Sequence, residues 1–330
     1  MIARALGLCV PVLIAAACAP TIVPPGPPIA PPELSAEAFR AADGVDLAVR
    51  SWGPKGGEPR AVVVALHGFN DYSNFFAQPG AFLAARGIQS YAYDQRGFGK
   101  SARPGMWPGV QAYVADLKAM VGEVRARHPS APLYLLGESM GGAVIMVAMT
   151  GPDPPANDGL ILSGPAVWGR STMPWYQRMA LWIAAHTLPW VKVTGEELEI
   201  RASDNNDMLK ALGRDPLVIK ETRIDAIHGM TDLMDAALES AQRLDAKALI
   251  LYGEKDEVVP PEPTFLMLAR RPQAAVGRQT VALYENGFHM LLRDLQAETV
   301  WLDVDAWIGD GAAALPSGAD EHARKVLAKR

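Results

Sequence analysis

Residues 133–142 read LYLLGESMGG. The apolar run Leu133–Leu136 predicts a buried strand, and the residues after Ser139 predict a helix. The pentapeptide from Gly137 to Gly141 fits G-x-S-x-G, the pattern of a serine on a sharp, strained turn between a strand and a helix. Gly137 and Gly141 would let the two backbones pass where a Cβ would clash. The context favours a serine that projects above the end of a sheet over one that only caps a helix.

Strands and helices alternate on both sides of this turn. Because buried apolar strands that alternate with helices form parallel sheets covered on both faces, the pattern predicts an α/β fold with a mostly parallel, eight-stranded sheet flanked by helices. A hairpin is expected around Asp43-Gly44. The six other strands are expected at 60–68, 88–94, 132–138, 158–164, 247–253 and 279–285. Helices are expected near 75–86, 110–128, 140–150, 262–270 and 290–308.

The alternation is interrupted at 167–246, a stretch too long for a connecting loop. It predicts a helical cap inserted over one end of the sheet, and the alternative is an ordinary two-layer core with buried aromatic side chains. Its first part is rich in tryptophan, which suits an acyl-chain pocket or contact with a bilayer surface. The substrate-pocket candidates are Trp168, Trp175, Trp182 and Trp190.

A serine hydroxyl needs a base to take its proton and an acid to orient that base. His289 follows the last expected strand, where a loop can bring its imidazole over Ser139. Asp256 follows the strand before it, in a turn closed by two prolines, and its neighbours Glu254 and Glu257 are expected to be solvated. The catalytic set predicted from this order is Ser139, Asp256 and His289. His67, at the end of another strand, is expected to be structural.

Acyl transfer also needs backbone donors for the oxyanion of the tetrahedral intermediate. The N–H of Met140, directly after the nucleophile, is one expected donor. The second is expected from the loop after the strand at 61–66, and Phe69 is the residue chosen there.

Five motifs together resemble the serine α/β-hydrolases of the monoacylglycerol lipase and lysophospholipase branch: HGFNDYS, DQRGFGKS, GESMGG, GEKDEVVPP and NGFHMLLRD. The resemblance spans roughly 39–309, and no stretch of the cap can be matched residue by residue. It implies a Ser–Asp–His triad, no cofactor or metal, and hydrolysis of single-chain lipid esters under a mobile lid. Asp94, Arg96 and Ser101 match a family stretch for which it implies loop-fixing hydrogen bonds.

The N-terminal segment predicts export. Residues 1–17 hold one positive charge and an apolar run with the length of a signal peptide, and they end in Ala-Ala-Ala before Cys18. This resembles a bacterial lipoprotein signal, which implies lipidation of Cys18 and a periplasm-facing, membrane-anchored protein of the cell envelope. A simply secreted protein and a signal anchor are the alternatives. Residues 18–36 are expected to form the anchor and a proline-rich, semi-rigid spacer.

The composition of the chain excludes several kinds of partner and site. The chain has 330 residues and a net charge of -5, which argues against nucleic acid as a partner. Its two cysteines, Cys9 and Cys18, both precede the body, which excludes a disulfide framework, a thiolate zinc site and a catalytic cysteine there. The hydrolase domain is expected at 37–310, followed by a flexible tail or short surface helix at 311–330.

The function expected from these observations is hydrolysis of carboxylic esters of monoacylglycerol or lysophospholipid type. A short-chain esterase, a thioesterase and an acyltransferase are alternatives on the same fold. A peptidase would need an anionic cap residue, for which Glu196 and Glu197 are candidates. The alternative from another class is a non-catalytic lipid-binding lipoprotein. Oligomeric state stays open.

Overall fold

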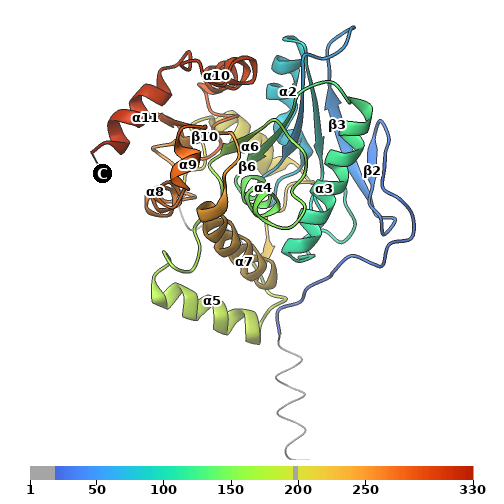
Figure 1. Cartoon of the computed structure of the whole chain (residues 1–330). Coiled ribbons are helices and arrows are strands. Elements are labelled where there is room, and N and C mark those ends of the chain that lie inside the picture. The colour runs from blue at the N-terminus through green and yellow to red at the C-terminus, as the bar shows by residue number, and fades with distance from the viewer. Residues whose placement is uncertain (1–18, 196–199, 330) are drawn as a thin grey trace, which may run out of the picture.

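A computed structural model describes residues 19–195 and 200–329. Cys18, the segment 1–17 and the candidates Glu196 and Glu197 lie outside the described residues. A nine-stranded sheet runs through the body in the order β1-β2-β3-β5-β4-β6-β7-β10-β11 (Figure 1). Its strands are β1 (Glu33–Leu34), β2 (Ala38–Arg40), β3 (Asp46–Trp52), β4 (Ala61–Leu66), β5 (Ile88–Tyr93), β6 (Leu133–Glu138), β7 (Gly159–Ser163), β10 (Ala248–Gly253) and β11 (Gln279–Tyr284).

Six neighbouring strands, from β5 to β11, are parallel, and β1, β2 and β3 join one edge antiparallel. The predicted hairpin is confirmed by β2 and β3, in which Ala38 pairs with Ala48. The predicted count of eight strands is wrong by one. The extra strand, β1, has only two residues and lies just after the proline-rich segment, so it leaves no alternating pattern to recognise.

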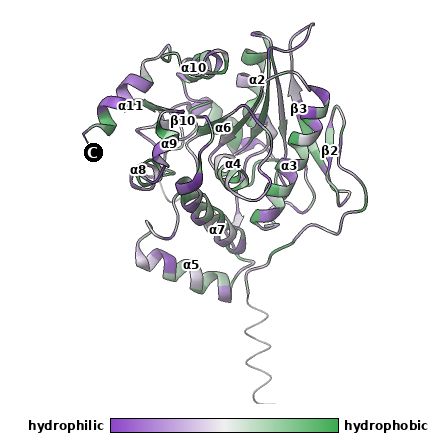
Figure 2. Cartoon of the chain, viewed as in Figure 1, coloured by the Kyte–Doolittle hydropathy of each residue, from purple (hydrophilic) through white to green (hydrophobic). Residues whose placement is uncertain are grey.

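Helices cover both faces of the sheet, as the alternation predicts. Side chains of β4 alternate between two apolar clusters: Val62, Val64 and Leu66 enter one, and Ala61, Val63 and Ala65 enter the other. Figure 2 shows the hydrophobic colouring concentrated on these central strands. The helices are η1 (Ser73–Phe76), α2 (Ala77–Ala84), α3 (Val110–Arg127), α4 (Met140–Thr150), α5 (Trp175–Thr187), α6 (Asn206–Arg214), α7 (Ile224–Ser240), η3 (Ala241–Arg243), α8 (Pro261–Ala269), α9 (Gln273–Val276), α10 (Ala297–Gly309) and α11 (Ala319–Leu327).

The insertion between β7 and β10 divides into two parts. Helix α7 packs on α4 and contributes Met230, Leu233 and Ala237 to the main core, so this half of the expected cap belongs to the helical layer. Helices α5 and α6 and the short pair β8 (Lys192–Val193) and β9 (Thr222–Arg223) make up the rest. Figure 1 shows α5 at the lower end of the molecule, below α7. Across the described residues, no helix combines the length and apolar character needed to cross a bilayer.

Two C-terminal predictions need correction. The last helix of the body, α10, begins at Ala297, so His289 lies in a turn segment before it and not at its head. Of the two alternatives for 311–330, the flexible tail is wrong and the short helix is present, since α11 lies along β11 and the segment buries Leu315, Ala319 and Ala323. Small alanines and charged residues concealed this packing, since the buried side of the helix is narrow.

The proline-rich segment lies along the body and does not extend from it as a free spacer. Val23 N–H donates to the carbonyl of Trp107 at 2.8 Å, and Ile29 N–H donates to the carbonyl of Ala42 at 2.7 Å. Gly26 N–H also bonds the Asp43 carboxylate at 3.1 Å. We call residues 19–32 the strap. Proline density gives no sign of this attachment, because the hydrogen bonds that make it come from distant residues.

The close passage of β6 and α4 yields the first prediction. A Cβ at Gly137 would come within 2.4 Å of the Gly141 carbonyl carbon, so Gly137→Ala should destabilise the fold by about 1–3 kcal/mol or more. The matched control is Gly122→Ala inside α3, where nothing beyond the adjacent backbone of the helix lies within 4 Å of the new Cβ. That variant should gain about 0.5–1 kcal/mol from helix propensity. Urea unfolding measures both changes, and equal midpoints would contradict the steric argument.

Candidate active site

Ser139 occupies a strained turn between β6 and α4. Its backbone has φ 52° and ψ -113°, a region that costs a non-glycine residue of order 1–3 kcal/mol. Its N–H donates to Ser163 O at 2.9 Å, and its carbonyl accepts from Ala166 N–H at 3.0 Å. The strained turn is the one that the G-x-S-x-G pattern predicts, and these two bonds to the end of β7 hold it in place.

The same end of β7 also contacts the other two triad residues. A Cβ built on Gly164 would lie 3.3 Å from His289 Nδ1 and 3.5 Å from Asp256 Oδ2. Gly164 adopts φ +47°, which keeps its backbone close to both groups. Ser139, Asp256 and His289 therefore meet around one strand end, although more than 100 residues separate Ser139 from Asp256 in the chain.

Asp256 orients His289. His289 Nδ1 lies 2.7 Å from Asp256 Oδ2, and both side chains are buried. The other carboxylate oxygen accepts the N–H groups of Val258 and Val259, each at 2.8 Å, which fixes the carboxylate plane. Nδ1–H of neutral His289 therefore donates to Asp256, and Nε2 keeps the lone pair that the predicted base requires. No hydrogen bond joins Ser139 Oγ to His289 among the described residues, and such bonds commonly tighten only with substrate.

The charge of Asp256 also sets the basicity of His289. Burial alone would lower the pKa of His289, but the charge and hydrogen bond of Asp256, with the charge of Glu138, outweigh it and raise the pKa above its ordinary value. Glu254 and Glu257 on the same turn are exposed, as expected, and Glu254 pairs with His322 instead.

The loop after β4 brings Gly68, the residue before Phe69, beside Ser139. Gly68 lies so close that its Cβ would come 3.4 Å from the Cβ of Ser139. His67 is buried, and its Nε2 accepts from Gln95 N–H at 3.0 Å, so Nδ1 carries the proton and donates to Gly68 O at 2.7 Å. Burial lowers the pKa of His67 and keeps it neutral. Because a trans peptide directs its C=O and N–H oppositely, this bond turns Phe69 N–H away from His67.

His67 is thus structural, as predicted, and its contacts orient the peptide expected to supply one oxyanion donor. Met140 N–H belongs to the first turn of α4, where N–H groups have no intrahelical acceptor. The assignment of Phe69 and Met140 as the two donors stays a prediction. Sequence reasoning missed Gln95, whose N–H and side-chain amide bond His67 Nε2 and the His67 carbonyl. It follows the aspartate of DQRGFGKS, a motif already singled out.

The loop-fixing roles implied for Asp94, Arg96 and Ser101 are present. Asp94 accepts the N–H of Ser73 at 2.9 Å, and Ser101 Oγ accepts the N–H of Phe98 at 2.9 Å. Arg96 bridges the carboxylates of Asp43 and Asp116, which ties this loop to the hairpin turn and to α3. Among the described residues, none of the three bonds a member of the predicted triad.

The tryptophans do not form a buried acyl pocket in this structure. Trp175, Trp182 and Trp190 are 66%, 58% and 53% exposed, and Trp168 is partly buried. Trp175 and Trp182 line a surface groove together with Arg178 and Met179. The pocket prediction therefore fails for the three exposed side chains, because helical spacing of apolar residues does not reveal which side of a helix faces the body.

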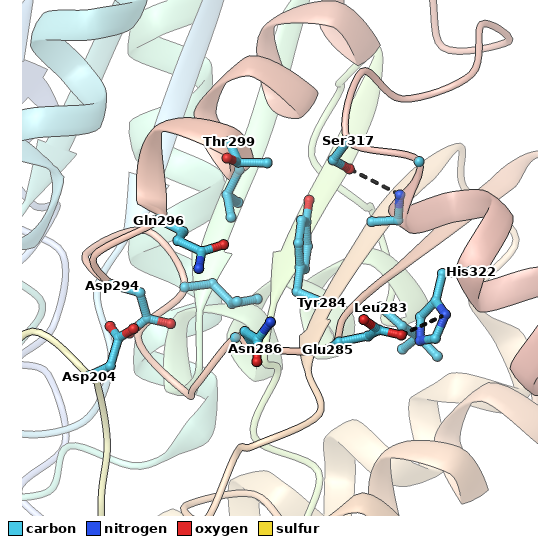
Figure 3. A pocket seen from close by; sticks show the side chains of 15 residues that line it. Asp204, Leu283, Tyr284, Glu285, Asn286, Asp294, Gln296, Thr299, Ser317 and His322 are labelled. Atoms are coloured by element: carbon cyan, nitrogen blue, oxygen red, sulfur yellow. Dashed lines mark hydrogen bonds and ion pairs between the residues drawn. The ribbon is translucent and has the colours of Figure 1, made fainter.

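A cavity of about 300 Å³ lies behind the His289 turn, between β11, α10 and α11. Figure 3 shows Asp294 and Asp204 on one side of it and Tyr284, Ser317 and His322 on the other. It includes no triad residue. Within the described ranges, no group of three or more histidine, cysteine, aspartate or glutamate side chains is arranged to hold a metal ion.

A family model described as serine aminopeptidase, S33 (Hydrolase_4), matches residues 57–296, which is most of the chain and includes all three triad residues. The chain belongs to this family. It is a serine hydrolase with the α/β-hydrolase fold.

The similarity to several known proteins covers nearly their full lengths. Monoacylglycerol lipase of Mycolicibacterium smegmatis is 26% identical over 83% of this chain and 96% of that protein. Monoglyceride lipase of Rattus norvegicus is 26% identical over 83% of this chain and 92% of that protein. Among solved structures, a soluble variant of monoglyceride lipase from Saccharomyces cerevisiae aligns with a TM-score of 0.70 at 22% identity, over 89% of this chain and 99% of that one.

The raised pKa of His289 predicts the pH dependence of turnover. Because the base must be neutral, kcat/KM should fall as pH drops through a pKa above the 6.5 of an ordinary histidine. Asp256→Asn should lower kcat by about 10⁴-fold, because it removes the acceptor that orients His289. It also removes a negative charge beside His289, so the acidic limb of the pH profile of kcat/KM should move to lower pH. Hydrolysis of an aryl ester across pH measures both.

The matched control is Glu254→Gln, which changes an exposed carboxylate on the same turn. It should leave the limb and kcat unchanged. An unaltered acidic limb in Asp256→Asn would contradict the role given to Asp256.

Proposed function

We propose that this protein hydrolyses carboxylic esters of single-chain lipids, with monoacylglycerols as the substrate class and lysophospholipids as the nearest alternative. The observation that carries the proposal is the buried His289–Asp256 pair at 2.7 Å beside the strained Ser139. Support for the lipid class comes from the relatives named monoacylglycerol lipase and monoglyceride lipase, which this chain matches over almost their whole length.

The proposed reaction proceeds through an acyl-enzyme. Ser139 Oγ attacks the ester carbonyl carbon while His289 Nε2 takes the hydroxyl proton, and the oxyanion is stabilised by the N–H groups of Phe69 and Met140. The tetrahedral intermediate collapses, and His289 gives its proton to the departing alcohol. Water, deprotonated by His289, then attacks the acyl-enzyme and releases the fatty acid with Ser139 restored. Asp256 stabilises the imidazolium at each step.

A substrate panel tests the proposal: a monoacylglycerol, a lysophospholipid, an aryl acetate and an acyl thioester, with Ser139→Ala as the blank. Each acyl methylene buried in the transition state contributes about 0.8 kcal/mol, close to fourfold in rate. kcat/KM should therefore rise with acyl length and favour the monoacylglycerol over the acetate by more than about tenfold.

The alternatives give distinct results in the same panel. Preference for the acetate would indicate a short-chain esterase, and preference for the thioester a thioesterase. Transfer of the acyl group to an added alcohol in place of water would indicate an acyltransferase. A folded wild-type protein that a fluorophosphonate probe fails to label on Ser139 would favour the non-catalytic lipoprotein.

We also propose that the protein is an exported lipoprotein of the bacterial cell envelope, attached through Cys18, with α5 as a second contact to the bilayer. Trp175, Tyr176, Met179, Trp182 and Ile183 are exposed apolar side chains on α5. Residues 171–195 contain Arg178 and Lys192 but no acidic residue, in a chain with a net charge of -5. Aromatic side chains and Arg178 on one exposed helix, with Lys192 in β8 shortly after it, suit an anionic lipid surface.

The strap supports the same orientation. Its residue Val23 bonds Trp107, and Trp107 packs so tightly on α7 that a Cβ at Gly229 would come within 2.3 Å of the indole. The adjacent His228 lies 5.9 Å, ring centre to ring centre, from His186 of α5. In Figure 1 the described chain begins at the lower end of the molecule, the end at which α5 also lies.

Vesicle flotation tests the contact through α5. In an acyl-free form that begins at Ala19, the double change Trp175→Ser and Trp182→Ser should weaken binding to phosphatidylglycerol vesicles by about tenfold or more, since it removes two large apolar side chains. Hydrolysis of a soluble aryl ester should stay unchanged. Val276→Ser, an exposed apolar position on α9, is the control. Equal binding of the double variant and the control would contradict the α5 contact.

A further inference from the structure

Arg293 is a buried cation that contacts two carboxylates from two other catalytic loops. Its guanidinium lies 2.7 Å from Asp71 Oδ2 and 2.6 Å from Glu138 Oε1, and each of the three side chains is less than 10% exposed. Glu138 precedes the nucleophile Ser139. Asp71 follows Phe69 by two residues, and Arg293 follows His289 by four. One guanidinium thus joins the serine turn, the expected oxyanion loop and the histidine turn.

Some polar atoms of these side chains have no partner besides the ion pairs. In the described part of the chain, Arg293 Nε and Glu138 Oε2 have no hydrogen-bond partner. Burial raises the pKa of Glu138, which the charge of Arg293 opposes. Because an unpaired charge in such a place costs several kcal/mol, the two acids and the cation must stay together, and their loops with them.

The Arg293 turn is also attached to the cap. Its carbonyl accepts the side-chain amide of Asn205 at 3.0 Å, and the neighbouring Asp294 accepts Ser203 Oγ–H at 2.6 Å. Met290 N–H donates to Ala202 O at 3.0 Å. Asp294 and Asp204 are seen side by side at this junction in Figure 3. The turn that carries Arg293 is therefore fixed from both sides.

We propose that Arg293 is a positioning residue for catalysis, which sets the relative placement of Ser139, the oxyanion loop and His289 through Glu138 and Asp71. A displacement of about 1 Å among such groups can cost about 10²-fold in rate. Arg293 also acts on the charge of the base. The charged groups that act on His289 are Asp256 after β10 and Glu138 at the end of β6, which favour the imidazolium, and Arg293, which opposes it.

This arrangement predicts opposite effects for two variants. Arg293→Met should lower kcat about 10²-fold and change KM by less than about threefold, because loop placement matters most in the transition state. It should also move the acidic limb of kcat/KM to higher pH, since a positive charge near His289 is lost. Glu138→Gln should move that limb to lower pH. Arg293→Lys should restore the limb while leaving kcat reduced, because an ammonium cannot bridge both carboxylates in the same geometry.

Arg96→Met is the matched control. Arg96 is another buried arginine that bridges two carboxylates, Asp43 and Asp116, away from the triad. Its loss should lower the melting temperature without shifting the limb. If Arg293→Met matches Arg96→Met in stability and keeps wild-type kcat and limb, the proposal is overturned. Should Arg293→Met fail to fold, Arg293→Lys and Glu138→Gln decide: wild-type kcat in the first and an unmoved limb in the second would overturn it.

The inference rests on the serine chemistry proposed above and not on the lipid class, so the assay uses an aryl ester and the rate of fluorophosphonate labelling. Wild-type protein that is labelled but hydrolyses no lipid ester would contradict the substrate class and still allow the Arg293 comparison. Wild-type protein that resists labelling would contradict the proposed function itself.

Discussion

The backbone contact among β4, β6 and α4 is the constraint on which the rest of the structure depends. A side chain at Gly141 would come within 2.3 Å of the Leu66 carbonyl oxygen, and one at Gly137 would meet Gly141. Only at this separation can the chain turn so sharply that Ser139 stands above the sheet in a strained conformation. The helix and strand are almost entirely buried, so rigid packing maintains the strain. The histidine and oxyanion loops can then be arranged around a fixed point.

The triad could be read from the sequence because each member follows a strongly apolar strand. Parallel strands bring their carboxyl ends to one edge, so Ser139, Asp256 and His289 had to lie near each other once the strand order was right. The alternation of β6, α4 and β7 could also be predicted from the sequence. In these segments local hydrophobic periodicity was sufficient to predict the strands and helices, because both faces of the strands are buried.

Other features depend on pairings that no local pattern records. The partners of Arg293 lie 155 and 222 positions earlier in the chain, and nothing near any of them marks the pairing. The exposure of Trp175 and Trp182 follows from where α5 lies relative to α7, and helical spacing alone suits a buried face as well. The same holds for α11 and the strap, whose contacts are made with residues far away in the chain. Two buried arginines, Arg96 and Arg293, each join segments in this way.

The two edge strands of the sheet affect how this protein can bind other chains. At one edge, the backbone N–H of Leu34 in β1 donates to Glu123 of α3 at 3.3 Å, and Arg127 donates to the Leu34 carbonyl. At the other edge, α11 lies along β11 and buries alanines against both apolar layers. Edge strands with free backbone groups are templates for aggregation and for strand addition by a peptide. With side chains bonding one edge and a helix covering the other, binding by β-augmentation to this nine-stranded sheet is disfavoured.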